Sequence, residues 1–323
     1  MREKTATAIA LAVLAFAVIC AALLSTANKD SGTTEAKTTA VWYTEPIHKV
    51  YESDGTELIV DNISYENYDY MDKPPVREGI EPLKEMTQEY LASRSGDWGV
   101  YIKNMKTREY FSINEKEYSA ASLIKLYTAA AVYNEIEAGT LQADDYVNDN
   151  LRLMLTESDN SACNRLTEIL GGGSAEKGFE IENANTASLG CQNTSHMSEI
   201  VDGGRITVLG RNHTSPTDCG IILDHLYYGT LVSNETSAKM LSLLEKQERT
   251  WKIPAGVPDD VKTANKTGET DTTEGDAAIV YSPNCNYIIC VIGNGNVGSG
   301  IETIRHISEM TYNYFNPNEN DIQ

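Results

Sequence analysis

The chain has 323 residues, enough for one large domain or two small ones with a substantial hydrophobic core. Its 47 Asp and Glu residues outnumber the 26 Lys and Arg residues, which gives a net charge of -21. A surface of that sign repels phosphate backbones and argues against nucleic acid as a partner. The rest of the composition is that of an ordinary globular protein.

The first 27 residues have the composition of an export signal. Arg2 and Lys4 precede an uncharged apolar run that ends at Leu24, and Ser25-Thr26-Ala27 supplies small residues where a signal peptidase would cut. The run is also nearly long enough to cross a bilayer if it is retained. We predict an exported protein, secreted or anchored at the outer face of the cytoplasmic membrane, with membrane contact only through this segment.

Residues 28–77 are polar and acidic with scattered tyrosines, which is typical of a spacer. Within them, Asp54-Gly55 favours a small hairpin turn. The folded domain is predicted to span residues 78–323. Its five cysteines are an odd number, so at least one thiol is free or pairs with another molecule. None has the spacing of zinc ligands, and we predict no metal site and no cofactor.

Alternating and helical segments organise the domain. A helix over 81–93 has Pro82 in its first turn, and a helix over 301–315 closes the chain. Alternating segments predict strands, and the apolar stretches between them predict helices. The strands are expected at 98–105, 108–114, 275–283 and 286–295, and the further helices at 118–139, 151–157, 161–170 and 217–229. This order predicts an α+β fold, an antiparallel sheet flanked by N- and C-terminal helices with an inserted all-helical subdomain.

Lys125 stands in an apolar helical stretch, an unfavourable place for an unpaired ammonium. Ser122 lies three residues earlier and therefore on the same helix face. A serine hydroxyl becomes a good nucleophile when a neighbouring base takes its proton. Apolar surroundings lower the pKa of a lysine toward the range in which it can be that base. The helix N-terminus at Ser122 would add free N–H groups for a developing oxyanion.

The pattern Ser-x-x-Lys is common by chance, and the chain has a second copy at Ser174 and Lys177. That copy is flanked by glycines and charges, so we interpret it as unrelated to catalysis. Two further triplets follow Ser122 in the chain. Ser158-Asp159-Asn160 could be an ordinary helix N-cap, and Lys266-Thr267-Gly268 an ordinary polar strand end. Each is common alone, whereas all three in this order are not.

These motifs resemble the penicillin-recognising serine enzymes, most closely the class A β-lactamases, which carry them in the same order. The resemblance covers about residues 78–315. It includes the strand pair before the nucleophile helix, a helix start at 214–218 with the pattern Thr-x-Pro-x-Asp, and the terminal strands and helix. It implies a serine hydrolase that acts on a β-lactam or a D-Ala-D-Ala peptide. We expect a monomer.

The resemblance also implies roles for the residues. Ser122 would be acylated, with Lys125 removing its proton. Ser158 would pass a proton to the departing nitrogen. The remaining residues would bind the substrate. Asn160 would hydrogen-bond its side-chain amide, Lys266 would supply positive potential, and Thr267, in the triplet that ends with Gly268, would hydrogen-bond its carboxylate. The backbone N–H groups of Ser122 and Glu269 would together form the oxyanion hole.

One part of the class A pattern is missing. Those enzymes release the acyl group with water activated by a glutamate in a Glu-x-x-Leu-Asn loop, and no such sequence occurs between Gly190 and Thr214. Glu199 is the best candidate, although it lacks the Leu-Asn that should follow. The stretch from Ser122 to Ser158 is also shorter than is usual in the family, so acylation is better supported than turnover.

Several functions therefore stay open at this stage. The first is a β-lactamase-type hydrolase, and the second is a penicillin-binding D,D-peptidase or a protein that is acylated without efficient turnover. A membrane sensor is disfavoured because only a few residues precede the apolar run. A dinucleotide site at 293–298 is disfavoured because a single predicted helix follows its glycines, with no second strand.

Overall fold

The computed structural model describes residues 50–51, 57–58, 79–200, 211–295 and 299–317. The predicted export segment and nearly all of the spacer lie outside these ranges, so those domain boundaries and the localisation stay predictions. Two short strands of the spacer are described, β1 (Val50–Tyr51) and β2 (Glu57–Leu58), and they pair antiparallel as the expected hairpin requires. Among the described helices, none is both long and apolar enough to cross a membrane.

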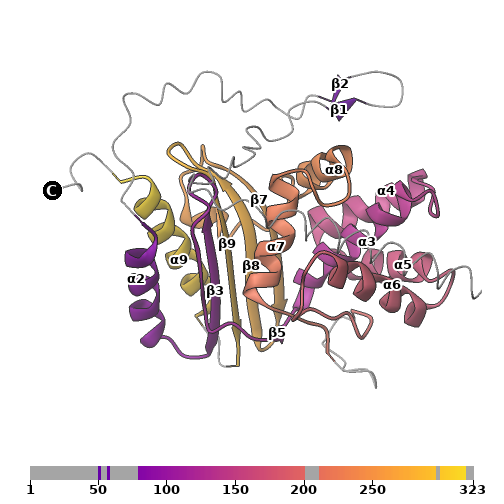
Figure 1. The fold of residues 1–323 in the computed structure, drawn as a ribbon. Coiled ribbons are helices and arrows are strands. Elements are labelled where there is room, and N and C mark those ends of the chain that lie inside the picture. The colour runs from indigo at the N-terminus through magenta and orange to yellow at the C-terminus, as the bar shows by residue number, and fades with distance from the viewer. Residues whose placement is uncertain (1–49, 52–56, 59–78, 201–210, 296–298, 318–323) are drawn as a thin grey trace, which may run out of the picture. The chain divides into compact units, whose positions relative to one another are not determined.

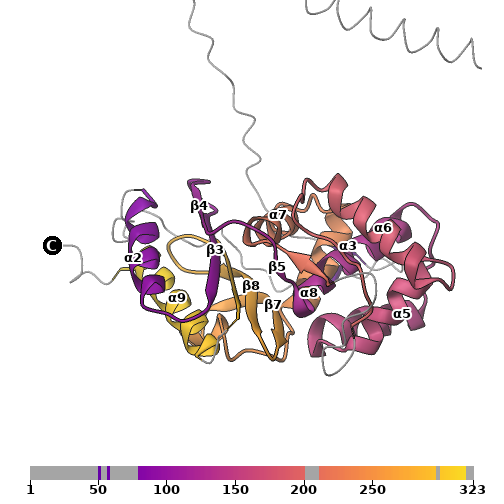
Figure 2. The ribbon, with the colours of Figure 1, turned by 90° about the horizontal axis from the view of Figure 1, so that it is seen from below.

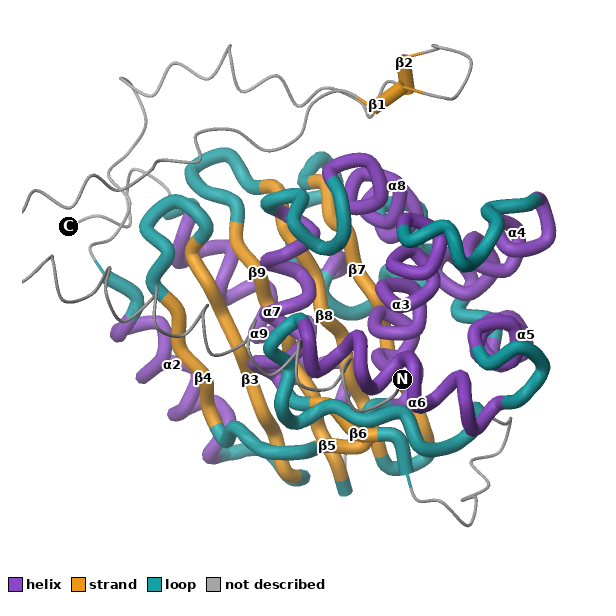
Figure 3. Tube along the Cα trace, turned by 45° about the vertical axis from the view of Figure 1, so that its right-hand side comes forward, coloured by secondary structure: helices purple, strands orange, loops and turns teal. Residues whose placement is uncertain are grey.

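A five-stranded antiparallel sheet forms the centre of the folded body, with the strand order β4-β3-β9-β8-β7 (Figure 3). Its strands are β3 (Asp97–Asn104), β4 (Tyr110–Ile113), β7 (Lys262–Thr270), β8 (Thr273–Tyr281) and β9 (Tyr287–Asn294). The first two and the last three are far apart in sequence, and β3 pairs with β9 along its whole length. The predicted α+β fold is confirmed.

Side-chain alternation along the strands builds two separate hydrophobic cores, one on each face of the sheet. On β9, Ile288, Cys290 and Ile292 belong to one core, and Ile289 and Val291 to the other. Both faces are covered, which explains why the strand is buried almost throughout instead of alternating with polar residues.

Two helices cover one face, α2 (Glu81–Ala92) and α9 (Gly300–Phe315), as Figures 1 and 2 show. The other face carries α7 (Pro216–Tyr227) and adjoins the helices inserted between β4 and β7. These inserted helices are α3 (Lys125–Glu137), α4 (Asp145–Arg152), α5 (Asn160–Leu170), α6 (Ala175–Ser188) and α8 (Asn234–Leu244). They confirm the expected helical insertion.

The stretch expected as one helix over 118–139 is divided into three elements. Tyr118–Ser119 is a strand, β5, which pairs with β6 (His213–Thr214). A 3-10 turn, η3 (Ala121–Ile124), follows, and α3 starts only at Lys125. Tertiary pairing thus overrides the local helical pattern over the first residues, as the backbone N–H of Ala120 donates to the carbonyl of Asn212 at 2.9 Å.

Glycines at the end of β9 have structural reasons unrelated to a nucleotide. A Cβ at Gly293 would lie 2.4 Å from the ring of Trp98, so the missing side chain makes room for the indole. Gly295 has φ +89°, a left-handed conformation that glycine adopts without strain. Both observations fit the predicted strand-to-helix turn.

Candidate active site

Ser122 lies in the 3-10 turn between β5 and α3, next to a residue of unusual conformation. Ala121 has φ +45°, one of four non-glycine residues with a positive φ in the part of the chain that the structure describes. Strained backbone of this kind persists where the surrounding structure holds it in place and is frequent at functional sites. Here β7 supplies part of that support, because a Cβ on Gly268 would lie 2.9 Å from the Ala120 carbonyl oxygen. Gly268 therefore permits the close approach of β7 to the serine turn.

Lys125 is fully buried, as the apolar stretch around it predicts. Its Nζ lies 3.0 Å from Ser122 Oγ, 2.6 Å from the Ser158 carbonyl oxygen, 3.2 Å from Ser158 Oγ and 2.7 Å from Asn160 Oδ1. The carbonyl and amide oxygens can only accept, so two N–H groups of the amine donate to them. The remaining position of the nitrogen faces the hydroxyls, where an ammonium would donate and a neutral amine would accept a proton.

Ser158 reaches Lys125 because its backbone is left-handed. It follows the π-helical turn η4 (Leu153–Glu157) and has φ +63° and ψ 36°. The next residue, Asp159, is the N-cap of α5, and its carboxylate accepts from the N–H of Ala162. The triplet is therefore both an ordinary helix N-cap and part of the candidate site: Asp159 caps the helix, while Ser158 and Asn160 contact the buried amine of Lys125.

Lys266 approaches the same hydroxyl from the sheet. Its Nζ donates to Ser158 Oγ at 2.7 Å and to the Thr267 carbonyl oxygen at 2.9 Å. The side chain is fully buried, and burial lowers its pKa well below the usual value, with further lowering by the charges of Lys125 and then Arg249. Ser122, Lys125, Ser158 and Lys266 therefore form one continuous series of polar contacts.

The residues after Lys266 line β7, which is at the edge of the described sheet. Thr267 is buried and Glu269 is half-buried. Alternate N–H groups of an edge strand point away from the sheet, which is what an oxyanion-hole donor requires. The structure thus brings three of the predicted binding residues, Thr267, Gly268 and Glu269, to the strand that borders the serine turn.

Glu199 is not a member of this contact network within the described residues. It is half-buried and lies at the end of the segment 191–200. Its neighbour Ile200 is fixed to α5 by Asn164, which donates to the Ile200 carbonyl at 2.8 Å and accepts from its N–H at 2.9 Å. Asn164 and Asn160 are four residues apart on one helix and share a face. A role for Glu199 stays a prediction.

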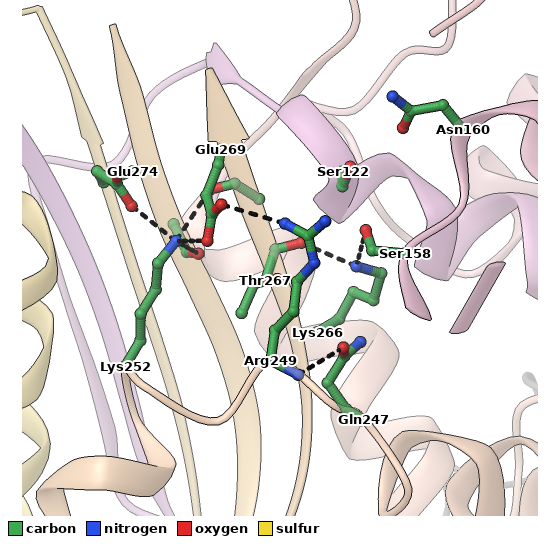
Figure 4. A network of polar contacts seen from close by, with 12 residues as sticks. Ser122, Ser158, Asn160, Gln247, Arg249, Lys252, Lys266, Thr267, Glu269 and Glu274 are labelled. Atoms are coloured by element: carbon green, nitrogen blue, oxygen red, sulfur yellow. Dashed lines mark hydrogen bonds and ion pairs between the residues drawn. The ribbon is translucent and has the colours of Figure 1, made fainter. Parts of the chain in front are cut away.

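Sequence reasoning missed a second polar network, which adjoins the first (Figure 4). Lys252 is fully buried, and its Nζ lies 2.9 Å from Glu269 Oε1 and 2.7 Å from Glu274 Oε2. Arg249 Nη1 lies 3.2 Å from Glu269 Oε2. Asp276 is buried on β8, where it accepts from the N–H of Ile253 at 3.0 Å and from Asn265 Nδ2 at 3.1 Å, and burial raises its pKa to about 7. A lone lysine between apolar residues, in the stretch Thr-Trp-Lys-Ile-Pro, was the available signal.

Comparisons with known proteins agree with this architecture. The sequence matches the β-lactamase enzyme family over residues 82–148 and 146–315. The structure is similar to PBP-A, with a TM-score of 0.66 and 23% identity over 75% of this chain and 98% of that one. It is also similar to a β-lactamase from Sphaerobacter thermophilus DSM 20745, with a TM-score of 0.64 and 22% identity over 73% of this chain and 97% of that one.

A third solved structure, the extended-spectrum β-lactamase TLA-1, has a TM-score of 0.66 and 19% identity over 73% of this chain and 99% of its own. No curated protein sequence matches the chain. Identities this low establish a shared fold only, whereas the family match spans well over half of the sequence. The chain belongs to the β-lactamase enzyme family and is a β-lactamase-like hydrolase.

Proposed function

We propose that this protein is an exported serine hydrolase that opens β-lactam amide bonds through an acyl-enzyme on Ser122. The observation that carries the proposal is the contact series from Ser122 through Lys125 and Ser158 to Lys266. It joins a hydroxyl to a buried amine and a second hydroxyl to another buried amine. Such a series can take a proton from one end and deliver it at the other.

Acylation would use the residues in that order. Neutral Lys125 takes the proton of Ser122 as Oγ attacks the carbonyl carbon, and the carbon–nitrogen bond then breaks. Ser158 gives its proton to the departing nitrogen and recovers one from Lys125. Lys266, whose pKa burial lowers, holds Ser158 Oγ at 2.7 Å in the position that this transfer needs. The backbone N–H groups of Ser122 and Glu269 would hold the oxyanion.

The same geometry suits an anionic substrate in an otherwise acidic protein. The net charge of -21 disfavours the approach of an anion, and a protonated Lys266 would oppose that effect locally. Thr267 is placed on β7 beside Lys266, where a substrate carboxylate would lie, and Asn160 would face the substrate's side-chain amide.

A penicillin-binding, peptidase-like protein with slow release of the acyl group is the second candidate, and one observation favours it. The loop residue that Asn164 fixes against α5 is Ile200, whose side chain packs on the hydrophobic core and cannot accept a proton. PBP-A, which is similar in fold, has a variant solved as an acyl-enzyme with penicillin G. The alternative differs from the first in the fate of the acyl-enzyme, not in its formation.

Incubation of the purified full-length protein with a chromogenic cephalosporin separates the candidates. Continued product formation supports a lactamase, whereas a single equivalent of product and a stable mass adduct support the second candidate. Ser122→Ala is the control and should give neither. Absence of both product and adduct from the wild-type protein would refute the proposed function.

Glu199→Gln then tests the water-activating role. If Glu199 activates the water, the variant forms the adduct at the wild-type rate and releases it at least about a hundredfold more slowly. Release at an unchanged rate removes Glu199 from the mechanism. Intact-protein mass against time measures both steps.

A further inference from the structure

The segment that leads to β7 spans the two sides of the candidate site. Gln247 Nε2 donates to the Leu155 carbonyl at 2.6 Å, and the N–H of Glu248 donates to the Thr156 carbonyl at 2.9 Å, which fixes the segment to the turn before Ser158. Asn265 Nδ2 donates to the Arg249 carbonyl at 3.3 Å, which fixes it to β7. The backbone of Arg249 is thus held between the Ser158 turn and the strand of the Lys-Thr-Gly triplet.

The guanidinium of Arg249 lies beside the Lys-Thr-Gly end of β7 and is already paired with Glu269. Its side chain is 36% exposed and contacts Glu269 Oε2 at 3.2 Å, and Figure 4 shows it between Glu269 and the Ser158–Lys266 contact. Its charge also lowers the pKa of Lys266, third after burial and Lys125, so it acts electrostatically on the site. Among the described cations of these two networks, Arg249 meets solvent, whereas Lys125, Lys252 and Lys266 are fully buried.

The carboxylate of Glu269 forms an ion pair with the guanidinium of Arg249. Oε2 faces Arg249 and Oε1 faces the buried Lys252, so the side chain is held by two charges. The backbone of Glu269 is held in place, because β7 is paired with β8 at the residues before and after the Glu269–Glu274 pair. A substrate carboxylate beside Thr267 therefore meets a guanidinium that already has an anionic partner, and a second carboxylate next to it.

We propose that the Glu269 side chain is a specificity-determining group, an internal competitor for Arg249 that reduces the advantage of a carboxylate over an uncharged group on the substrate. The inference rests on the proposed function, because it concerns the acylation of Ser122. It assigns the side chain of Glu269 a role separate from that of its backbone N–H. Substrates that are amidated or esterified at this position are acylated nearly as fast as their acids.

Glu274 is the matched control, because it is a second carboxylate on the same lysine. It pairs with Lys252 at 2.7 Å from the neighbouring strand. Its side chain packs against the start of α9, since a Cβ on Gly300 would lie 2.4 Å from Glu274 Cγ. Glu274 shares its sheet face with Glu269, its cross-strand partner, but no ion pair among the described residues joins it to Arg249, so Glu274→Gln alters the same buried network and leaves the Arg249–Glu269 pair in place.

The test compares benzylpenicillin with its methyl ester as acylating agents of the full-length protein, followed by intact-protein mass. For the wild type we expect an acid-to-ester ratio of second-order rate constants within a few-fold of one. Glu269→Gln should raise that ratio about tenfold or more, because a charged hydrogen bond to Arg249 becomes available to the acid alone. Glu274→Gln should leave the ratio within about twofold of the wild-type value.

Arg249→Gln keeps the inference testable should Glu269→Gln fold poorly. In the wild-type background it should change the acid-to-ester ratio by less than about threefold, because Glu269 already holds the guanidinium and keeps Lys252 as its partner at 2.9 Å when Arg249 is removed. A tenfold loss for the acid would show that Arg249 is free to bind substrate and would overturn the inference. An unchanged ratio in a folded Glu269→Gln protein would overturn it too. Failure of both agents to acylate the wild-type protein would instead refute the proposed function, and the inference with it.

Discussion

The chain carries the pattern Ser-x-x-Lys twice, and the two copies lie in opposite surroundings. At Ser122 the lysine is fully buried and its amine contacts the serine hydroxyl at 3.0 Å. At Ser174 the lysine is exposed, and the hydroxyl instead accepts from the backbone N–H of Lys177 at 3.3 Å as the N-cap of α6. Identical spacing therefore gives a buried serine–lysine contact in one place and a helix cap in the other.

The difference lies in what surrounds the amine. The Lys125 nitrogen has two oxygens that can only accept, from Ser158 and Asn160, and they orient it toward the hydroxyls. No contact of that kind reaches the Lys177 side chain from the described residues, and water solvates an exposed ammonium fully. Burial and fixed acceptors, which come from residues more than thirty positions away, distinguish the Ser122 copy of this common spacing from the Ser174 copy.

The largest expected effect separates the two serines. Ser122→Ala should lower acylation by a chromogenic cephalosporin by at least about a thousandfold, because it removes the proposed nucleophile, the hydroxyl that contacts Lys125 at 3.0 Å. Ser174→Ala should leave the acylation rate unchanged. Mass adducts after incubation measure both, and an adduct on the Ser122→Ala protein would move the nucleophile elsewhere and end the comparison.

The sequence predicted which residues form this site more accurately than it predicted the backbone conformation of those residues. Ser122, Lys125, Ser158 and Lys266 were expected together from their order in the chain, and the structure places them in contact. The 3-10 turn at Ser122 and the left-handed Ser158 were not expected, because strand pairing and long-range contacts impose them. Local propensity cannot report such effects.

The second network shows a different limit. The contacts of Lys252 with Glu269 and Glu274 depend on the register that places those two glutamates opposite each other on β7 and β8. Register follows from the whole sheet, so nothing in the sequence indicates that the side chain of either glutamate pairs with a buried lysine. The α+β order of elements, by contrast, follows from alternation and was predicted.

The second effect in size separates the two lysines. Lys125→Met should lower acylation by about a hundred- to ten-thousandfold, since it removes the base and leaves the hydroxyl with no proton acceptor at 3.0 Å. Lys177→Met changes an exposed side chain and should alter neither acylation nor, by more than about 0.5 kcal/mol, the free energy of unfolding. Equal losses in the two variants, measured by initial acylation rates, would contradict the interpretation.

The pH dependence of the free energy of unfolding distinguishes a buried lysine, Lys266, from an exposed one, Lys177. The pKa of Lys266 in the folded protein is lowered by burial, so between that value and the unfolded value near 10.5 the unfolded chain binds more protons than the folded one. Stability of the wild type should therefore rise with pH across this window, by at most about 1.4 kcal/mol per pH unit. The loss of stability from burying a protonated Lys266 is fully present below the pKa of the folded protein and is absent above the pKa of the unfolded chain.

Lys266→Met lacks this titration and provides the measurement. The stability of the variant relative to the wild type should be greatest at low pH within the window and should decline toward pH 10.5, as followed by urea unfolding at several pH values. A difference that does not vary with pH would mean that Lys266 keeps an ordinary pKa. For Lys177→Met, which changes an exposed lysine, the free energy of unfolding should depend on pH in the same way as that of the wild type.

The smallest effect belongs to the second serine as a helix cap. Ser174→Ala removes the hydroxyl that accepts from the Lys177 N–H, and the loss of such a cap costs about 1 kcal/mol of unfolding free energy. Ser174→Asp retains an oxygen acceptor at the N-terminus of α6 and should restore most of that stability. Urea midpoints detect the loss, and acylation assays on the same samples should show no change. A slower acylation with unchanged stability would place Ser174 in the chemistry and remove the distinction between a buried and a solvated copy of one motif.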